Sequence, residues 1–381
     1  MSATAAEFHA LLGELRPGKH GFPEGPGRSH PIALATLVDV RGSSYRRPGA
    51  RLLVREDGST VGNLTGGCLD AEIIEAAGEV ERTGDARRLS FDLSADDEAV
   101  LGWGMGCNGV LDILVEPAAS ARVSAGVITE AMSARRPAAL LTIVSGSAVG
   151  QHWWQTGSAG PARGPEGAGP PPDAVRSALV AGRTGLVTLP SSRGRGEEQA
   201  FVEVLQPPPR LVVCGAGVDA LPVTRRAAEL GWDVCVVDDR RPALSPDRFP
   251  PGTTLILSSA GPSRELPVDG NTHVVVMSHN FLRDRDYLGA AMATDARYIG
   301  VLGPRRRLQR LLDDLGRDGV ALTGRDGRRL HGPAGLDLGA QGPDEIAISI
   351  IAEVLAASRG RDGQEPAGRP YALDLAAEPP V

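Results

Sequence analysis

The stretch from Arg210 to Arg240 constrains the fold of this chain more than any other. Residues 211–214 are apolar and fit a buried parallel strand. Residues 215–217 read Gly-Ala-Gly, a turn whose backbone can approach a ligand closely because both glycines lack a Cβ. A helical run then stops at Gly231, and a second apolar strand occupies residues 234–237. This order predicts the first half of a dinucleotide-binding βαβ unit, and therefore a Rossmann-like, doubly wound parallel sheet.

The same stretch predicts where a nucleotide would bind. Gly215 and Gly217 would let a phosphate sit at the helix N-terminus, where free N–H groups and the helix dipole favour an anion. Asp238 and Asp239 follow at about the 20-residue distance where an acidic side chain accepts from ribose hydroxyls. Asp219 opposes this interpretation, because its charge in the first helical turn would repel a pyrophosphate. A turn that serves packing alone is the alternative.

Composition and charge exclude several classes of protein. Of the 381 residues, 41% are apolar and 23% charged, which is ordinary for a globular protein of two or three domains. The net charge of −7 argues against general nucleic-acid binding. No basic start precedes an apolar run and no stretch is apolar enough to cross a membrane, so we expect a cytoplasmic protein. The four cysteines show no CxxC spacing, so neither a disulfide framework nor a zinc motif is predicted.

The chain before the triple proline at 207–209 is predicted to form an α/β domain, residues 1–206. Residues 151–173, with a Gly/Pro-rich loop at 155–173, are the internal segment expected to be least ordered. The run ALATLVDVRG from Ala33 is echoed by ALLTIVSGSA from Ala139, which suggests a duplication. Strands are predicted at 32–40, 50–55, 90–93, 110–116, 138–144, 186–189 and 200–205, and helices at 71–81, 123–134 and 175–181.

Two cysteines of this domain lie in glycine-rich surroundings. Gly66, Gly67 and Cys68 are expected at the N-terminus of the helix at 71–81, where backbone donors converge and a thiolate is favoured. Cys107 follows a second glycine-rich run and precedes the strand at 110–116. The alternative for both is a small apolar residue in a tight turn. Cys214 and Cys235 fall inside predicted strands and are expected to be inert.

The second domain is predicted over residues 207–360, followed by a flexible tail at 361–381. Further strands are expected at 254–258, 273–277 and 298–302, and a last amphipathic helix at 344–358. Arg305 and Arg306 open the helix after Gly303-Pro304, at the C-terminal edge of the sheet where such sheets bind ligands.

Taken together, short motifs in both domains resemble the XdhC/CoxI family, accessory proteins of molybdenum hydroxylases such as xanthine dehydrogenase. The resemblance extends over residues 32–358. In the first domain it is carried by residues 42–51 (GSSYRRPGAR), 66–70 (GGCLD), 106–109 (GCNG) and 115–117 (VEP). In the second it is carried by residues 208–217 (PPRLVVCGAG), 237–240 (VDDR), 298–306 (YIGVLGPRR), 331–340 (HGPAGLDLGA) and 343–347 (PDEIA). The chain departs from the family pattern at Asn108, Val218, Asn280 and Pro304, where the family usually has Gly, His, Asp and Ser.

The resemblance implies a function. Family members bind the molybdenum cofactor, as molybdopterin or its cytosine dinucleotide, and keep it intact while its terminal sulfur is installed. They then deliver it to a molybdenum hydroxylase apoenzyme. A homodimer is also implied, and a cysteine desulfurase is a further candidate partner. The chain lacks an iron–sulfur cysteine set, so we do not expect it to oxidise xanthine alone.

The resemblance also suggests roles for single residues. Cys68 and Cys107 would ligate molybdenum or carry sulfur. His279 follows a predicted strand end and is a candidate base or metal ligand, with a hydrogen-bonded histidine of the cleft as the alternative. Anion contacts would come from Arg46, Arg47, Arg51, Arg240 and the cluster Arg305, Arg306 and Arg307, although loop arginines commonly form surface ion pairs instead.

Two rival functions stay open. The first is an NAD(P)-dependent oxidoreductase, based on the glycine turn and Asp238. The second is a docking scaffold whose Rossmann-like domain binds no small molecule. Because of the family resemblance, we expect an accessory chaperone rather than a catalyst.

Overall fold

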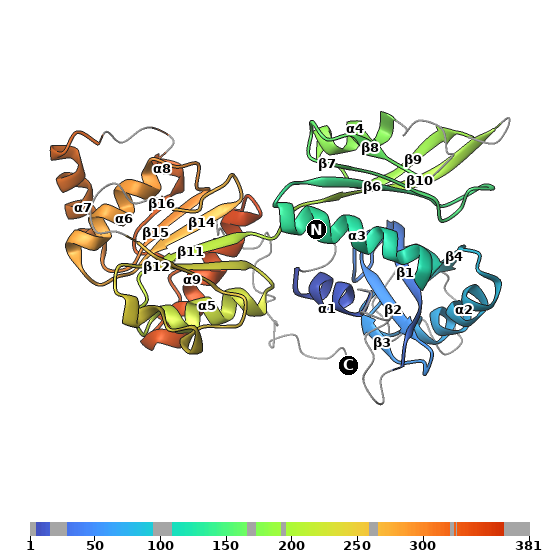
Figure 1. Cartoon of the computed structure of the whole chain (residues 1–381), viewed down its shortest axis with the longest axis horizontal. Helices are drawn as coiled ribbons and strands as arrows, with labels where there is room; N and C mark the ends of the chain where they lie inside the picture. Colours follow the sequence, from blue (N-terminus) through green and yellow to red (C-terminus); the bar gives the residue numbers. More distant parts are fainter. Residues whose placement is uncertain are drawn as a thin grey trace, which may run out of the picture. The chain divides into compact units, whose positions relative to one another are not determined.

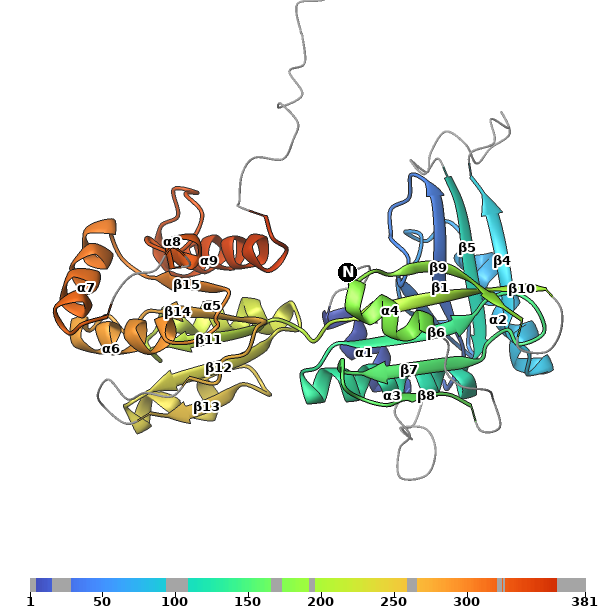
Figure 2. The same cartoon turned by 90° about the horizontal axis from the view of Figure 1, so that it is seen from above.

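The structure is a computed structural model that describes residues 5–15, 29–93, 109–165, 173–191, 196–258, 266–320, 324 and 326–361. The chain divides into two compact units, Met1–Pro208 and Pro209–Val381 (Figures 1 and 2). The division falls within the three consecutive prolines, residues that lack the N–H needed to continue a sheet or helix. Among the described residues, every helix is too short or too polar to cross a membrane.

The first unit begins with a five-stranded antiparallel sheet. Its strand order is β3-β2-β1-β5-β4. Helix α2 covers the outer face, where Ile73 and Ala77 pack in one cluster with Ala35 and Leu37 of β1. The elements are α1 (Ala5–Leu15), β1 (Pro31–Gly42), β2 (Arg51–Arg55), β3 (Thr60–Gly62), α2 (Asp70–Thr83), β4 (Arg87–Asp92) and β5 (Gly109–Pro117).

The second sheet of this unit has the same topology. Its strand order, β8-β7-β6-β10-β9, repeats that of the first sheet element by element. Helix α4 covers the outer face, with Val175 against Leu141 and Val202. The elements are α3 (Ala118–Ala134), β6 (Ala138–Ile143), β7 (His152–Thr156), β8 (Ala162–Arg163), α4 (Asp173–Ala181), β9 (Gly185–Pro190) and β10 (Glu197–Leu205). We name residues 5–117 repeat 1 and residues 118–205 repeat 2.

Strand registers show that the two repeats match residue by residue. In repeat 1, Thr36 lies opposite Arg51 on β2 and Leu114 on β5. In repeat 2, Thr142 lies opposite His152 on β7 and Phe201 on β10. Thr36 and Thr142 are the residues that the echo between ALATLVDVRG and ALLTIVSGSA aligns. The duplication suggested by the sequence is therefore present in the topology.

The expectation of little order at 151–173 is wrong for the first part of that segment. Strand β7 pairs with β6, and Trp153 within it is buried. Strand β8 then pairs with β7. Aromatic residues packing on a sheet outweigh the Gly- and Pro-rich composition that follows them. Residues 166–172 lie outside the described part of the chain, as does most of the tail predicted from 361.

The inner faces of the two sheets pack against each other. Val38 and Leu114 of repeat 1 form one apolar cluster with Val144 and Phe201 of repeat 2. Val38 and Val144 occupy equivalent positions in the two repeats, and so do Leu114 and Phe201. The cavity left between the sheets measures about 10 Å³, room for about one water molecule and far too little for a cofactor.

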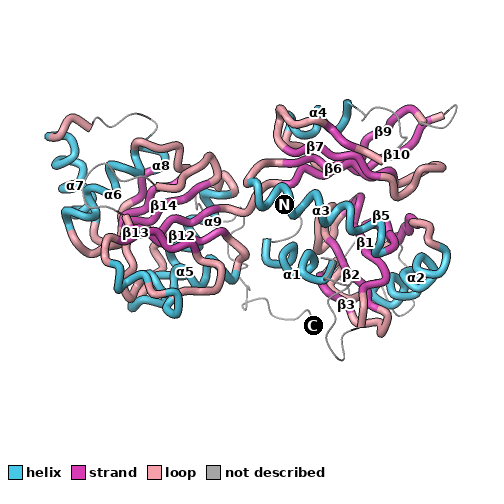
Figure 3. The backbone as a smooth tube through the Cα atoms, viewed as in Figure 1, coloured by secondary structure: helices cyan, strands magenta, loops and turns pink. Residues whose placement is uncertain are grey.

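The second unit is a six-stranded sheet, whose strands lie among helices in Figure 3. Every described strand pair of this sheet is parallel. Its order, β13-β12-β11-β14-β15-β16, confirms the Rossmann-like fold, with the reversal of strand order between β11 and β14. The strands are β11 (Arg210–Cys214), β12 (Asp233–Asp238), β13 (Thr254–Leu257), β14 (Thr272–Val276), β15 (Tyr298–Val301) and β16 (Leu330–His331).

Helices cover both faces of this sheet. Alternate residues of β11 face opposite sides, so Leu211 and Val213 pack with α5 and α9, whereas Val212 and Cys214 pack with α6 and α7. Burial on both faces explains why the strands are continuous apolar runs. The helices are α5 (Ala220–Glu229), α6 (Phe281–Met292), α7 (Arg305–Arg317), α8 (Asp326–Arg329) and α9 (Gly342–Ser358).

Candidate functional site

The glycine turn of the second unit lies where the strand order reverses. Gly215 has a left-handed backbone (φ +119°), and a Cβ there would come within 2.6 Å of the Ser278 Cα beyond β14. The Gly215 N–H donates to the Val237 carbonyl at 2.9 Å. The backbone after β11 is therefore wedged between the ends of its two neighbouring strands, and glycine is required at this position.

Asp238 holds this turn in place. It is 2% exposed, and its carboxylate accepts from the Ala216 N–H at 2.7 Å and from the Arg240 N–H at 2.8 Å. The Arg240 guanidinium donates to both carboxylate oxygens at 2.9 and 2.8 Å. Burial opposes ionisation of Asp238, but these hydrogen bonds and the Arg240 charge outweigh it and lower the Asp238 pKa. The residue expected to contact a ribose is thus occupied by the protein's own groups.

The side chains of His279 and Asp219 lie close together beside the turn. The His279 Nε2 lies 2.9 Å from the Asp219 Oδ2, and the histidine backbone is left-handed (φ +59°). A Cβ on Gly217 would lie 3.7 Å from the His279 ring, so the ring covers the glycine. The carboxylate that His279 lacks at position 280 is therefore supplied by Asp219. Asn280 instead caps α6, where its Oδ1 accepts from the Arg283 N–H at 3.1 Å.

Two further residues of this edge form an ion pair: Asp284, which was not among the predicted site residues, and Arg307, the last residue of the arginine cluster 305–307 predicted to face this edge. Asp284 is buried and accepts from the Ser278 N–H at 2.9 Å and from the Ser278 hydroxyl at 2.5 Å. Arg307 donates to the other Asp284 oxygen at 2.7 Å. Nearby, the Arg283 Nε donates to Asp239 at 2.9 Å. The edge is thus a set of paired charges from several loops, which no short motif in the sequence reveals.

Arg305 and Arg306 are exposed and make no ion pair with any residue that the structure describes. Arg305 borders a hollow of about 470 Å³ together with His331 and Glu353. The His331 Nδ1 lies 2.9 Å from Glu353, which also accepts from the Tyr298 hydroxyl at 2.5 Å. Burial opposes ionisation of Glu353, but hydrogen bonds from its neighbours lower its pKa.

In the first unit, three loops of repeat 1 leave the sheet at the same edge. Strand β1 ends at Gly42, opposite Gly109 at the start of β5, and β4 ends at Asp92, opposite Val110. Strand β3 ends at Gly62, opposite Leu52 near the start of β2. The loops at 43–50 and 63–69 therefore leave from the same end of the sheet as Leu93 and Gly109, which bound the segment that carries Cys107, although Gly62 is level with Ala35 of β1 and Gly109 with Gly42. We name this end of the sheet the cysteine edge. Cys107 itself lies outside the described residues.

Cys68 lies just before α2, in a loop held by short-range hydrogen bonds. The Asn63 Oδ1 accepts from the Gly66 N–H at 2.8 Å, and the Thr65 hydroxyl accepts from the Leu69 N–H at 3.3 Å. The Cys68 thiol is half-buried and donates to the Thr65 carbonyl at 3.4 Å.

Room and donors remain around this thiol. A Cβ on Gly66 or Gly67 would meet no atom within 4 Å. Among the described residues, the N–H groups of Gly67 and Cys68 have no acceptor. The site offers a thiol, two backbone donors and open space at a helix N-terminus, which suits an anionic group carrying a soft metal.

The other cysteines of the described chain are enclosed. Cys214 and Cys235 are buried in β11 and β12. Burial raises the pKa of the Cys235 thiol to about 12, so a thiolate does not form there near neutral pH. Within the described residues, no cluster of three or more His, Cys, Asp or Glu side chains could hold a metal ion.

The three arginines of the first unit that were predicted to contact an anion differ in their contacts. Arg46 donates to both oxygens of Glu7 at 2.8 and 2.7 Å. Arg51 is 4% exposed and donates to both oxygens of Glu203 at 3.1 and 2.5 Å. Arg47 is exposed and makes no ion pair within the described residues. It is the arginine of this loop best placed to meet an anion from solvent.

Two family models match the chain and together cover more than half of it. One, described as the XdhC and CoxI family, matches residues 27–92. The other, the XdhC Rossmann domain, matches residues 211–354. The chain belongs to the XdhC and CoxI family. The first match contains Cys68 and the loop at 43–50, and the second contains the glycine turn, Asp238 and His279.

Relatives of this XdhC/CoxI chain span nearly its whole length. It is 28% identical over 332 residues to a probable xanthine dehydrogenase subunit of Bacillus subtilis, covering 84% of this chain and 92% of that protein. It is 25% identical over 326 residues to the molybdenum cofactor insertion chaperone PaoD of Escherichia coli, covering 84% and 81%. A crystal structure described as a xanthine dehydrogenase from Bacillus halodurans superposes with a TM-score of 0.73 at 28% identity, covering 95% and 97%.

Proposed function

We propose that this chain is a maturation factor for molybdenum hydroxylases. It binds the molybdenum cofactor, protects it while its terminal sulfur is installed, and inserts it into the apoenzyme. Membership of the XdhC/CoxI family and similarity to a molybdenum cofactor insertion chaperone over most of both chains carry this proposal. The Bacillus subtilis relative, with xanthine dehydrogenase in its name, supports a client of the xanthine dehydrogenase or CO dehydrogenase type.

The cysteine edge is the part of the described structure that best suits the cofactor. The cofactor is anionic and carries a metal with sulfur ligands. A thiolate at Cys68 would ligate the metal or carry sulfur, and the N–H groups of Gly67 and Cys68 would hold an anionic oxygen. Arg47 would pair with the phosphate, with Cys107 as a second thiol. When bound, the cofactor supplies the redox chemistry of the client enzyme, and the chain keeps it positioned and shielded.

The first experiment measures cofactor retention. The chain would be purified under reducing, anaerobic conditions, and its pterin would be measured by fluorescence after denaturation. We expect pterin in near-stoichiometric amount, and a large loss in Cys68→Ala or Cys107→Ala. Cys235→Ala is the control, because it removes a thiol enclosed in the other unit. Absence of pterin from the unaltered chain, or equal retention in all three variants, would contradict the proposal.

The Rossmann-like unit supports a second candidate, NAD(P) binding for an oxidoreductase. Its strand order and glycine turn are those of dinucleotide-binding domains. Against this, Asp238 is already paired with Arg240, and His279 covers Gly217. We expect calorimetric titration with NADH to give no submillimolar binding. Binding that Gly217→Val abolishes would instead favour the oxidoreductase. A docking scaffold would bind an apoenzyme and no small molecule at all.

The proposal also includes a homodimer and transfer of sulfur from a cysteine desulfurase. Light scattering of the purified chain would give its mass in solution, and a dimer is the expected result. Incubation with a desulfurase and cysteine should place a persulfide on Cys68 or Cys107, which peptide mass spectrometry would detect. A persulfide on Cys214 or Cys235 would show that the assay had unfolded the chain.

A further inference from the structure

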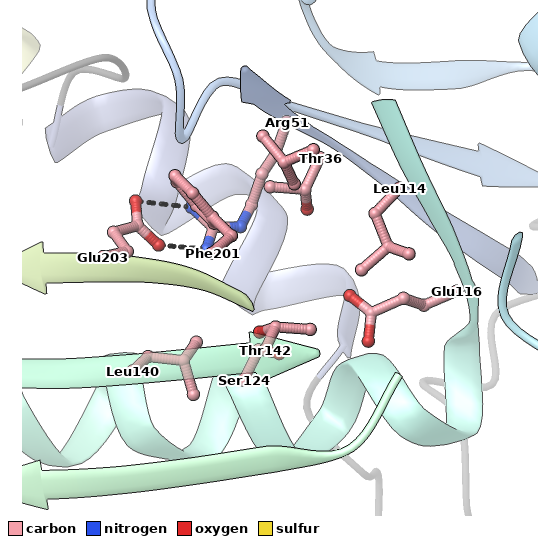
Figure 4. Close-up of a pocket in the computed structure, with 10 residues that line it drawn as sticks. Thr36, Arg51, Leu114, Glu116, Ser124, Leu140, Thr142, Phe201 and Glu203 are labelled. Atoms are coloured by element: carbon pink, nitrogen blue, oxygen red, sulfur yellow. Dashed lines mark hydrogen bonds and ion pairs between the residues drawn. The ribbon is translucent and has the colours of Figure 1, made fainter. Parts of the chain in front are cut away.

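Two pairs of titratable side chains cross between the repeats at equivalent positions. Arg51 on β2 of repeat 1 pairs with Glu203 on β10 of repeat 2 (Figure 4). His152 on β7 of repeat 2 has its Nε2 2.8 Å from the Oε1 of Glu116 on β5 of repeat 1. The strand registers place Arg51 and His152 at one equivalent position, and Glu116 and Glu203 at another. All four side chains are buried. The attraction within a buried ion pair offsets the cost of removing its charges from water only if both partners keep a favourable geometry.

The two pairs differ in what they reach. Besides Glu203, the Arg51 Nη1 donates to the Gly49 carbonyl at 3.0 Å, where the loop at 43–50 returns to the sheet. The His152 Nδ1 lies 3.0 Å from the Thr142 hydroxyl, a neighbour on β6. The arginine pair therefore extends to a loop of the cysteine edge, whereas the contacts of the histidine pair stay on strands.

Arg51 is connected to the second loop of the cysteine edge as well. Its carbonyl accepts from the Asn63 N–H at 3.1 Å. Asn63 in turn accepts from the Gly66 N–H at 2.8 Å, two residues before Cys68. A Cβ on Gly62 would collide with the Arg51 carbonyl, so the loop can pass this point only at glycine. A shift of Arg51 would therefore be transmitted to the backbone that presents the thiol.

We propose that Arg51, held by Glu203 of repeat 2, is a positioning residue for the Cys68 loop, so that the repeat without cysteines controls how the thiol is presented. This inference rests on the proposed function in one respect, namely that the cysteine edge binds the cofactor. Arg51 is thereby assigned to the interior, and not to contact with the cofactor phosphate.

The test compares the two pairs in the full chain. Glu203→Gln and Glu116→Gln remove the same charge at equivalent positions. Each variant would be treated with iodoacetamide under native conditions, and alkylation of Cys68 would be followed by peptide mass spectrometry, which separates it from Cys107. Losing one or two hydrogen bonds that hold the loop raises its open population by about fivefold to thirtyfold. We expect that rise in the Cys68 rate in Glu203→Gln, and a change below about twofold in Glu116→Gln.

A second variant separates positioning from loss of fold. The double variant Arg51→Met, Glu203→Leu removes both buried charges together, which folded domains commonly tolerate. It also removes the donor to Gly49, so the fast alkylation should persist although the far-ultraviolet circular dichroism is unchanged. Equal Cys68 rates in the two Gln variants, or a rate restored by the double variant, would overturn the proposal. Because alkylation needs no cofactor, the result stands even if the chain proves to bind no pterin.

Discussion

The two repeats of the first unit share one topology and differ in their loops. Each is a helix followed by three strands, a second helix and two strands, and the sheets have the same order. Their inner faces present equivalent residues, Val38 with Val144 and Leu114 with Phe201. Packing against each other preserves these positions in both copies, because a volume change on either side is felt by both.

The sheet edges, in contrast, have diverged. In repeat 1 the first two strands are joined by residues 43–50, which read SSYRRPGA, and Cys68 follows β3. In repeat 2 the first two strands are joined by residues 144–151, which read VSGSAVGQ, and the repeat has no cysteine. In many proteins the functional residues lie on loops that a rigid scaffold positions. Here the two packed sheets would be the scaffold, and the loops of repeat 1 would carry the proposed site. Under the proposed function, the comparison assigns the cofactor site to repeat 1 and a supporting role to repeat 2.

The largest expected effect concerns the two pairs that cross between the repeats. Arg51→Met leaves Glu203 buried without its fork of donors, and should lower the free energy of unfolding by about 3–5 kcal/mol. His152→Gln at the equivalent position should cost less, about 1–3 kcal/mol, since the His152 Nε2 lies close to Glu116 without forming a hydrogen bond to it. Urea unfolding of the full chain would measure both. Equal decreases in the free energy of unfolding would show that the two pairs contribute equally to stability.

Gly109→Ala should have the next largest effect. A Cβ at this position would lie 2.6 Å from the Arg41 carbonyl oxygen and 2.9 Å from that of Ser43, and backbone atoms cannot rotate away. Overpacking of this kind costs about 1–3 kcal/mol. Because Gly109 begins the strand that follows Cys107, we also expect lower pterin retention. Gly185→Ala is a suitable control, as its Cβ would meet no atom within 4 Å. Unchanged stability in Gly109→Ala would refute this close approach.

Exchange of two equivalent core residues tests the packing of the repeats directly. Leu114→Phe and Phe201→Leu each change the volume of the shared cluster and should cost about 1–2 kcal/mol. The double variant keeps the total volume, so its cost should fall below the sum of the single costs. Thermal unfolding of the four chains would give this coupling. Strict additivity would show that the two side chains do not share one space.

The smallest effect is a pH dependence of one repeat. Burial opposes ionisation of Asp112, but hydrogen bonds from Arg88 and Ser90 and the charges of Arg88 and Arg41 lower its pKa. A carboxyl with a lowered folded pKa stabilises the fold above its unfolded pKa of about 3.9, and that stability is lost as pH falls through the folded value. The equivalent residue in repeat 2 is the neutral Gln199, which also accepts from Arg88 at 2.6 Å.

Asp112→Asn should therefore make repeat 1 resemble repeat 2. The variant is expected to be less stable at pH 7 and to lose less stability than the unaltered chain between about pH 5 and pH 2. Urea unfolding at a series of pH values would show this as a smaller decrease in the free energy of unfolding as the pH falls. A decrease as large as that of the unaltered chain would assign the acid sensitivity to other carboxylates, such as Asp238.

Much of the fold could be predicted from local pattern. The strands of the Rossmann-like unit are buried on both faces, so their apolar runs are continuous, and the Gly-Ala-Gly turn marks the first crossover. In the first unit the strands at 32–40, 110–116 and 138–144 were predicted at nearly their observed positions. Their pairing could not be predicted, because antiparallel registers depend on contacts between residues far apart in the chain.

The site was predicted less completely than the fold. Cys68 was expected at a helix N-terminus, and it lies directly before α2. The contacts of Asp238, Arg46 and Arg51 were not predicted. The partner of Asp238 is Arg240, only two residues away, whereas the partner of Arg51 is Glu203, 152 residues away. Asp284 carried no motif, and Arg307 was predicted to contact an anion and not to pair with Asp284.

The sequence by itself determined which segments form strands, helices and glycine turns, because these depend on side-chain periodicity and backbone freedom within a few residues. Only the tertiary structure decided which charged groups remain available to a ligand. A carboxylate or guanidinium is consumed by whatever partner the fold brings within hydrogen-bonding distance, and that partner can lie anywhere along the chain.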